Sequence, residues 1–549
     1  MSTTVWFNSY IYKALIQGIS FARIIDAAGS SVGQAVACDS SGNLYIAGSY
    51  TKYATIETQD GTYISTLPNV YGAAAFVSKF DSNGVYQYSR IVDSTNTTSD
   101  WGYGVACDSS GNIYLAGQYA TAAPTIKDQN ANILGTLPAP TNSGAFCCKF
   151  DSTGTYQYSR IVDAIGNDVG RSVTCDSSGN MYLAGNYSGS ASIYAVNSSN
   201  VSTTIATLPN TISTTNAAFC CKFNSSGTYQ YSRLVDGFTS EIGYSVTCDI
   251  SGNMYLAGQY STASPTIIYV NSSNVATNVS SLPAASSIAS FLSKFDSSGN
   301  YQFSRVIDGA GSDYGYGVAC DSSGYVYLTG QFAATSQALI KNQGGAIIGG
   351  FPALQNASAY VVKFDSNGNL YSNVTPPTTF ARIVDGAGAE IGYGVTTDSN
   401  RNMYLAGQYS IGIPTIYDQY GTPIGTLPAP AAGTTAFVCK FDSTGTYQYS
   451  RIVDGTGNDV GQSVACDSSG NMYFACNYGL STPTIKDENG TNLITLPSSY
   501  SSVSKFNSNG IYQFSIICSV PTALNSVACD TSGNFFIDRK STRLNSSHV

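Results

Sequence analysis

Histidine is nearly absent from this chain of 549 residues, in which the single copy is His548. Without histidine, Ser-His-Asp hydrolysis, histidine-metal catalysis and histidine-based lyase chemistry lose the group on which they depend. The chain also lacks a Gly-rich phosphate-binding loop that ends in Lys-Ser or Lys-Thr. Paired carboxylates could still hydrolyse glycosides, but no acid pair stands out from a periodic background. The sequence therefore favours a non-enzymatic protein.

Charge and long apolar runs are also scarce. Charged residues make up 10% of the chain, the net charge is -9, and Lys and Arg form no cluster, which argues against a nucleic-acid partner. No apolar run approaches the roughly 18 residues of a membrane helix, and the opening residues lack the pattern of a signal peptide. We predict no membrane insertion and no recognisable secretion signal. The sequence does not indicate the cellular compartment.

Turn formers and β-prone residues are abundant instead. Hydrophobic residues reach 43%, with 55 Gly and 41 Tyr, and this composition predicts an all-β protein. One phrase recurs along the chain, as in "GVACDSSGNIYLAGQY" and "SVTCDISGNMYLAGQY". An arginine marks each unit at intervals of 67, 70, 73, 72, 77 and 69 residues. The chain is therefore an array of repeats of about 70 residues that share one core. The marker arginines are Arg23, Arg90, Arg160, Arg233, Arg305, Arg382 and Arg451.

Each unit contains two predicted hairpins. In residues 161–233, "GRSVTCD" and "NMYLAGNY" flank one Ser-Gly turn, and "AAFCCKF" and "TYQYSRLV" flank another. We name these four strands A, B, C and D. An extra hairpin lies between B and C, and it is clearest at residues 414–428 and 483–497.

Both faces of strand B carry apolar side chains, since Met181 and Leu183 alternate with Tyr182 and Ala184. A four-stranded antiparallel sheet that is buried on both faces and repeated is the blade of a β-propeller. A two-sheet sandwich would instead show one polar face. We predict a β-propeller of four-stranded blades, each with an extra B to C hairpin.

The sequence contains seven complete repeats and a partial eighth. Strand D appears first at "GISFARII", before any strand A, and an A and B pair appears for the eighth time at residues 525–537. Propellers commonly close by pairing an N-terminal outer strand with the last blade, so eight blades are favoured over seven. The domain prediction is an N-terminal segment at 1–17, a single propeller at 18–538 and a non-native tail at 539–549, "RKSTRLNSSHV", beyond which the natural chain is expected to continue.

The run "AFVCKFDSTGTYQYSRIVDGTGNDVGQSVACDSSGNMYFACNY", residues 436–478, resembles the repeat of the bacterial "seven-bladed β-propeller" repeat family. The resemblance extends from about Gly18 to Ile537. The chain departs from that pattern by placing Cys or Thr where a second apolar residue usually stands, and by its long hairpins. The resemblance implies the propeller fold, and it implies little about function because the family has no single activity.

Most of the recurring polar residues have structural explanations. Asp176 and its copies open the A to B turn, where an Asp side chain accepts backbone N–H groups. Lys149, Arg160 and their copies account for 14 of the 24 basic residues, and we interpret them as charges between blades or at blade edges. Cys175 and its equivalents are expected on the innermost strand as small, reduced, packed thiols. These equivalents are Cys38, Cys107, Cys248, Cys320, Cys466 and Cys529, with Thr397 in one unit.

One set of acids is a candidate ligand site. It lies in the D to A loops and comprises Asp100, Asp168, Glu241, Asp313, Glu390 and Asp459, with Ser31 in the first unit. The resemblance places the B to C hairpins at the same end of the propeller, which makes that end the expected binding surface. A solvated turn acid that supports its neighbouring Gly is the favoured role, and a site for a cation or a basic ligand is the alternative. We predict no catalytic residue, no metal centre and no cofactor, with Ca²⁺ as the one candidate cation.

The preferred function is a non-catalytic scaffold that presents repeated loops to a protein or a glycan, because many copies of one weak site gain strength together. One alternative is a carboxylate-based hydrolase or lyase in the central channel, and another is a structural protein of a virus or a cell surface. An extracellular or particle-surface location follows from the resemblance alone. The ligand and the oligomeric state are not predicted.

Overall fold

The computed structural model describes residues 23–58, 62–94, 98–120, 122–212, 215–261, 264–333, 337–353, 357–370, 379–518, 524–529, 535–539 and 541–542. These residues form antiparallel strands and turns, and no helix occurs among them. The predicted N-terminal segment 1–17 and most of the predicted tail, including His548, lie outside the described residues. The all-β prediction is confirmed.

Strands A and B occur in each unit. The A strands are β2 (Ser30–Cys38), β6 (Trp101–Cys107), β12 (Val169–Cys175), β18 (Ile242–Cys248), β24 (Tyr314–Cys320), β30 (Ile391–Thr397), β36 (Val460–Cys466) and β42 (Leu524–Cys529). The B strands are β3 (Leu44–Thr58), β7 (Ile113–Ala120), β13 (Met181–Tyr187), β19 (Met254–Ser261), β25 (Val326–Ala333), β31 (Met403–Ser410), β37 (Met472–Ser481) and β43 (Phe535–Arg539).

Strands C and D complete the repeated unit. The C strands are β4 (Tyr63–Phe80), β10 (Ser143–Phe150), β16 (Ala217–Phe223), β22 (Ile288–Phe295), β28 (Ala357–Phe364), β34 (Thr434–Phe441) and β40 (Ser499–Phe506). The D strands are β5 (Tyr86–Asp93), β11 (Tyr156–Asp163), β17 (Tyr229–Asp236), β23 (Tyr301–Asp308), β29 (Phe380–Asp385), β35 (Tyr447–Asp454) and β41 (Tyr512–Cys518). Each set pairs in the order A, B, C, D, as the two predicted hairpins require.

The extra hairpins attach to a different sheet from the one expected. They are β8 (Thr125–Asp128) with β9 (Ile133–Thr136), β14 (Ala191–Asn197) with β15 (Ser202–Leu208), β20 (Thr266–Asn271) with β21 (Ala276–Ser281), β26 (Ala338–Asn342) with β27 (Ile347–Phe351), β32 (Thr415–Asp418) with β33 (Pro423–Thr426), and β38 (Thr484–Asp487) with β39 (Asn492–Thr495). Each hairpin pairs with strand D of the preceding unit, as β8 does with β5. Five of the sheets therefore have six strands, of which the outer two come from the next repeat.

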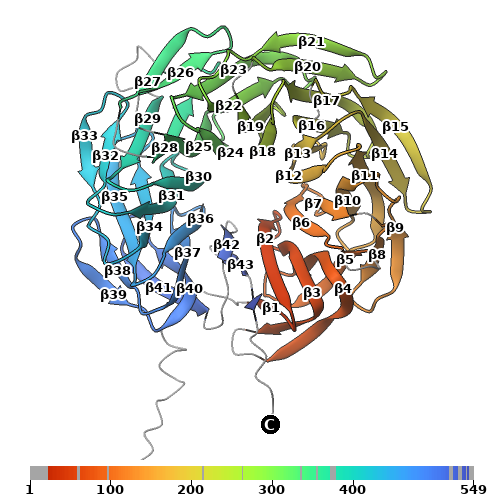
Figure 1. The fold of residues 1–549 in the computed structure, drawn as a ribbon. Helices are drawn as coiled ribbons and strands as arrows, with labels where there is room; N and C mark the ends of the chain where they lie inside the picture. Colours follow the sequence, from red (N-terminus) through yellow and green to blue (C-terminus); the bar gives the residue numbers. More distant parts are fainter. Residues whose placement is uncertain are drawn as a thin grey trace, which may run out of the picture.

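The pairing of each hairpin with the preceding sheet, which we call the hairpin exchange, corrects a prediction. The extra hairpins do not lie at the end of the propeller that carries the loop acids. Their strands lie along the outer rim (Figure 1), where they cover strand D. An uncovered strand D would expose a row of unpaired backbone groups, so the hairpin protects an edge. Only the connecting segments return to the end with the acids, where the Thr141 amide donates to Asp163 Oδ1 at 2.9 Å.

The sheets follow one another around a ring, with the A strands nearest the centre (Figure 1). Strand β42 contacts both β36 and β2. Strand β1 (Arg23–Ala27) pairs with the outer part of β3 in the register that β5 uses with β8, so it occupies the place of a D strand ahead of the first unit. The short β44 (Ser541–Thr542), from the predicted tail, pairs with the start of β2.

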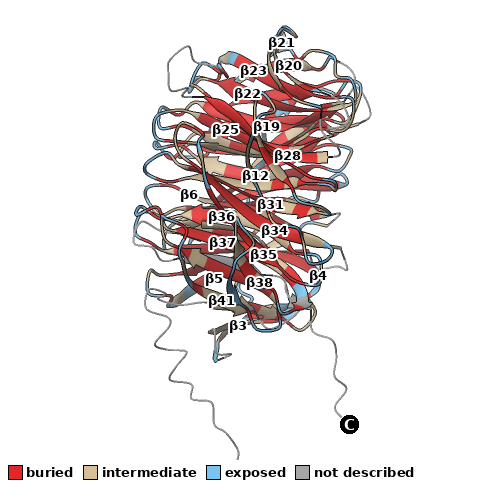
Figure 2. Ribbon diagram, turned by 90° about the vertical axis from the view of Figure 1, so that its left-hand side faces the viewer, coloured by how far each residue is buried: buried red, intermediate tan, exposed pale blue. Residues whose placement is uncertain are grey.

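The core lies between successive sheets, and buried residues run through the strands while exposed ones gather in the turns (Figure 2). Every residue of β13 is buried, as expected for a sheet that is covered on both faces. Tyr114 and Cys147 of one sheet, for example, belong to the same apolar cluster as Met181 and Leu183 of the next. The prediction of two-sided burial is confirmed.

Candidate functional site

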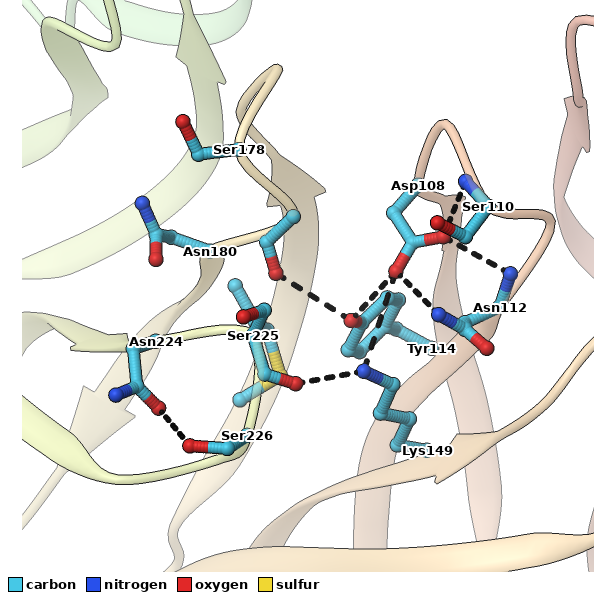
Figure 3. A network of polar contacts seen from close by, with 12 residues as sticks. Asp108, Ser110, Asn112, Tyr114, Lys149, Ser178, Asn180, Asn224, Ser225 and Ser226 are labelled. Carbon is cyan, nitrogen blue, oxygen red and sulfur yellow. Dashed lines mark hydrogen bonds and ion pairs between the residues drawn. The ribbon is translucent and has the colours of Figure 1, made fainter.

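Lys149 connects two neighbouring sheets. It lies on β10, and its Nζ donates to the Ser225 carbonyl oxygen, in the turn between β16 and β17 of the next sheet, at 2.7 Å (Figure 3). Asp108 Oδ2 lies 3.9 Å from the same nitrogen, and the Tyr114 ring centroid lies 5.1 Å from it. The lysine is therefore a charged contact between sheets, surrounded by a carboxylate and an aromatic face.

Arg160 makes the second contact with the same turn. Its Nε donates to the Gly227 carbonyl oxygen at 2.7 Å, and its guanidinium lies 4.2 Å from the Tyr158 ring centroid. Lysine and arginine thus bind two carbonyl groups of one turn of the next sheet. We call this pair, with its copies, the clamp.

The clamp recurs around the molecule. The lysine bonds, at 2.6–2.9 Å, join Lys79 to Ser152, Lys149 to Ser225, Lys222 to Ser297, Lys294 to Ser366, Lys363 to Ser443 and Lys440 to Ser508. The arginine bonds, at 2.5–2.7 Å, join Arg23 to Gly84, Arg90 to Gly154, Arg160 to Gly227, Arg233 to Gly299, Arg305 to Gly368, Arg382 to Gly445 and Arg451 to Gly510. The interpretation of these residues as charges between sheets is confirmed.

The recurring turn aspartates also have the predicted role. Asp108 Oδ1 accepts the amides of Ser110 and Asn112, at 3.0 and 2.9 Å. Its Oδ2 accepts Asn112 Nδ2 at 2.8 Å and the Tyr114 hydroxyl at 3.0 Å. The last copy, Asp530, lies outside the described residues. The carboxylate thus organises its own turn and the first residues of strand B.

The recurring cysteines occupy the end of the innermost strand, as predicted. Cys107, Cys175, Cys248, Cys320 and Cys466 are reduced thiols there. Burial raises the pKa of the Cys175 thiol well above its usual range. Such a thiol stays neutral near pH 7, and it packs as a small apolar group.

The six loop acids are fully buried at 0% exposure, one in each of six successive units. Asp168 Oδ2 accepts the Ala164 amide at 2.5 Å, and its Oδ1 accepts the Ser188 amide at 3.2 Å. Asp313 repeats this arrangement with the amides of Gly309 and Ala333. Each of these two carboxylates therefore binds one backbone amide of its own loop and one at the end of strand B, and its burial corrects the prediction of a solvated turn acid. The full set is Asp100, Asp168, Glu241, Asp313, Glu390 and Asp459.

These acids do not converge on a common point. Within the described ranges, no three His, Cys, Asp or Glu side chains lie close enough together to hold a metal ion. The alternative role, a site for a cation or a basic ligand, stays a prediction.

Burial makes the loop acids sensitive to pH. It raises the pKa of Asp168 to about 8 and that of Asp313 to about 7, while hydrogen bonds from backbone amides offset part of the shift. An acid whose pKa is higher in the folded than in the unfolded state contributes stability below about pH 4 and loses it as the pH rises towards 8. We expect the thermal unfolding midpoint to fall between pH 5 and pH 9.

Asp168→Asn isolates one of these groups, because an amide does not titrate. The variant should show a smaller fall of the midpoint between pH 5 and pH 9 than the wild type, as measured by circular dichroism. A midpoint that rises with pH across this window would contradict the assignment.

A set of residues that the sequence analysis missed lies on the A strands. Seven sheets contain a β-bulge at the same place, where one extra residue of strand A stands opposite strand B. A bulge redirects its side chain. The extra residues are Gln34, Tyr103, Arg171, Tyr244, Tyr316, Tyr393 and Gln462.

The bulge position varies while its surroundings are repeated. In these seven units a Gly precedes the bulge residue, and Ala, Gly or Ser follows it. A varying residue between a constant Gly and a small residue is the signal that could have identified the bulge positions from the sequence. The prediction assigned this segment, as in "GRSVTCD", to a regular strand A.

Four of the bulge residues contact one another in series from sheet to sheet. The Arg171 guanidinium lies 5.5 Å from the Tyr244 ring centroid, which lies 5.6 Å from the Tyr316 ring centroid. Tyr393 follows at 6.5 Å from Tyr316, and Tyr314 stacks on Tyr316 at 5.5 Å with an interplanar angle of 8°. All of these side chains are half-buried. We call Arg171, Tyr244, Tyr316 and Tyr393 the bulge arc.

Arg171 differs from the clamp arginines. Its Nε donates to Asn186 Oδ1 at 3.0 Å, and no carboxylate of the described chain lies within ion-pair distance of it. Its charge lowers the pKa of Tyr244, although burial raises that pKa by more. The arc thus combines three aromatic rings with one cation.

The ring of repeated antiparallel sheets defines the class of this protein: an all-β repeat protein of the β-propeller kind. No protein-family model matches the chain. The chain is 22% identical, over 498 residues, to an uncharacterized WD repeat-containing protein of Acanthamoeba polyphaga mimivirus. That match covers 80% of this chain and 35% of the relative, so the chain spans about a third of the relative's length.

Two solved structures were also matched at low similarity. A protein of unknown function from Bacteroides caccae is 9% identical with a TM-score of 0.22, covering 62% of this chain and 92% of its own. Rhamnogalacturonan lyase YesW is 9% identical with a TM-score of 0.21, covering 78% and 90%. At these scores neither carries an argument about function.

Among the described residues, no helix has the length and hydropathy of a membrane span.

Proposed function

We propose that the chain is a non-catalytic β-propeller scaffold that binds a partner protein or glycan. One observation carries the proposal: the repeated lysines, arginines and aspartates bind backbone groups of turns and neighbouring sheets. In this role they hold the scaffold together, and the positions left to vary are those that a ligand would contact.

The proposal also covers the number of blades, the type of repeat, the role of the loop acids and the location of the scaffold. We place eight blades around the axis, with β1 as the D strand of the eighth, because β42 lies between β36 and β2. The repeat is of the bacterial seven-bladed β-propeller type, on the motif of residues 436–478. The loop acids stabilise the D to A loops, and no cofactor takes part. The scaffold acts at a cell or particle surface.

A pull-down and a glycan array with the tagged chain test the binding function. We expect at least one ligand class to bind in the presence of EDTA, because the proposal needs no Ca²⁺. Loss of all binding on chelation would contradict the proposed role of the acids. Turnover of a bound glycan would contradict the non-catalytic role.

A structural role in a virus particle is the second candidate function, and the source of the WD repeat-containing relative favours it. It predicts ordered self-association of the purified chain. Sedimentation velocity from 1 to about 100 µM distinguishes the two, since a monomer across this range would leave binding as the function.

A further inference from the structure

The bulge arc has the composition of a recognition surface. Tyr and Arg are enriched at the residues that dominate binding between proteins, because they offer large rigid contact areas and directed polar groups. Tyr244, Tyr316 and Tyr393 are half-buried and contact one another, so their rings are held in place before a ligand arrives. Preorganisation of this kind reduces the entropy that binding costs.

Arg171 gives the arc its charge preference. The guanidinium lies 5.5 Å from the Tyr244 ring centroid and donates through Nε to Asn186, and its two terminal nitrogens have no ion pair in the described chain. A planar guanidinium is suited to a carboxylate that binds through both oxygens. A ligand with an acidic group at one end and apolar groups along the rest matches this order of residues.

The arc is elongated, because each of its members lies on a different sheet. The three contacts from Arg171 to Tyr393, each of 5.5–6.5 Å, follow the curve of the inner strands (Figure 1) for about the length of five residues of extended chain. An extended segment that follows this curve can contact all four residues in turn. Proline-rich extended segments are well suited to aromatic surfaces, since little entropy is lost when they bind.

We propose that the bulge arc binds an extended acidic segment of a partner protein, with a carboxylate on Arg171 and apolar or proline side chains across the three tyrosines. This inference rests on the proposed binding function and names its site and its partner. Protein is favoured over glycan because the arc combines aromatic anchors with one arginine beside an aromatic ring, as interfaces between proteins do.

The chain itself supplies the test variants. Gln34 and Gln462 occupy the same bulge in other sheets, so Arg171→Gln and Tyr316→Gln introduce a residue that the bulge already accommodates. Gln462→Asn changes a bulge outside the arc and serves as the control. Arg171→Gln and Gln462→Asn should unfold near the wild-type temperature, whereas Tyr316→Gln, which loses its ring contacts with Tyr244, Tyr314 and Tyr393, should unfold at a lower temperature but remain folded at the assay temperature.

The probe is a library of linear dodecapeptides displayed on phage, selected in parallel on the full chain and on the Arg171→Gln, Tyr316→Gln double variant. We expect enriched peptides with Asp or Glu beside Pro or aromatic residues. In fluorescence anisotropy, each single variant should weaken the best peptide by about tenfold or more, and Gln462→Asn should not. The Asp→Asn form of the peptide should lose sensitivity to Arg171→Gln.

Three outcomes would overturn the inference. Peptides that bind the double variant as well as the wild type would place the site elsewhere and leave the scaffold proposal intact. Array glycans whose binding is lost in the double variant would assign the arc to glycans instead. If neither peptides, glycans nor pull-down partners bind the wild type, the proposed function fails with the inference.

Discussion

Arg233→Ala is expected to destabilise the protein by at least about 3 kcal/mol, since it removes charge-assisted hydrogen bonds and leaves a cavity in the core. The Arg233 side chain is 1% exposed and donates to the Gly299 and Ser232 carbonyl oxygens at 2.6 Å each. The Tyr231 and Tyr269 ring centroids lie 4.1 and 3.7 Å from its guanidinium. Burial lowers its pKa to about 10, so the group remains charged at pH 7. Urea denaturation followed by tyrosine fluorescence measures the loss.

Arg171→Gln is the control for this substitution, because Arg171 takes no part in the clamp. It should leave the urea midpoint within the error of the wild type. Arg233→Lys should give an intermediate midpoint, since lysine keeps the charge and loses the planar fork that reaches both carbonyl groups. Equal midpoints for Arg233→Ala and the wild type would show that the clamp does not hold the sheets together.

Gly227→Ala should also lower the unfolding midpoint strongly, by an effect equivalent to about 3 kcal/mol. Gly227 lies in the turn that receives Lys149 and Arg160, and its φ of +82° is unfavourable for a residue with a side chain. A Cβ atom would overlap Arg160 Nη2 and lie 2.7 Å from Tyr158 Cζ. The substitution therefore combines backbone strain with displacement of the clamp.

Gly179→Ala separates these two effects. Gly179 has a similar φ of +74°, but the nearest atom to its Cβ would be Ser225 Cβ at 3.5 Å, which is ordinary contact. This variant should show only the cost of the left-handed backbone, about 1–2 kcal/mol. If the two glycine variants unfold at the same urea concentration, steric pressure on Arg160 contributes nothing.

The repeat and its four strands could be predicted from the sequence because local signals agree at each point. The Ser-Gly turns, the alternation in strand B and the recurring Asp176 all indicate the same hairpins. The structural role of Lys149 and Arg160 could be predicted from their recurrence, since a residue that recurs in every unit usually stabilises the fold of that unit. Their partners, two carbonyl groups in the next repeat, could not be identified because backbone carbonyls carry no sequence signal.

The hairpin exchange was not predictable for a related reason. The segment at residues 125–136 reads as a local hairpin, and its pairing with β5 depends on the uncovered edge that the preceding repeat presents. The bulge was missed because one inserted residue, such as Tyr316, breaks the alternation that identifies a strand. The repeat places Tyr244, Tyr316 and Tyr393 at equivalent positions, and the sheet register shows that each is the extra residue of a bulge.

The central claim is that repeated polar residues hold the scaffold together and that the bulge positions are free to vary. Its most direct test is a scan of every single substitution across residues 156–233, with resistance of the displayed chain to protease as the measure of folding. We expect low tolerance at Arg160, Asp168, Lys222 and Gly227 and high tolerance at Arg171. Broad tolerance at the first four positions, together with intolerance at Arg171, would contradict it.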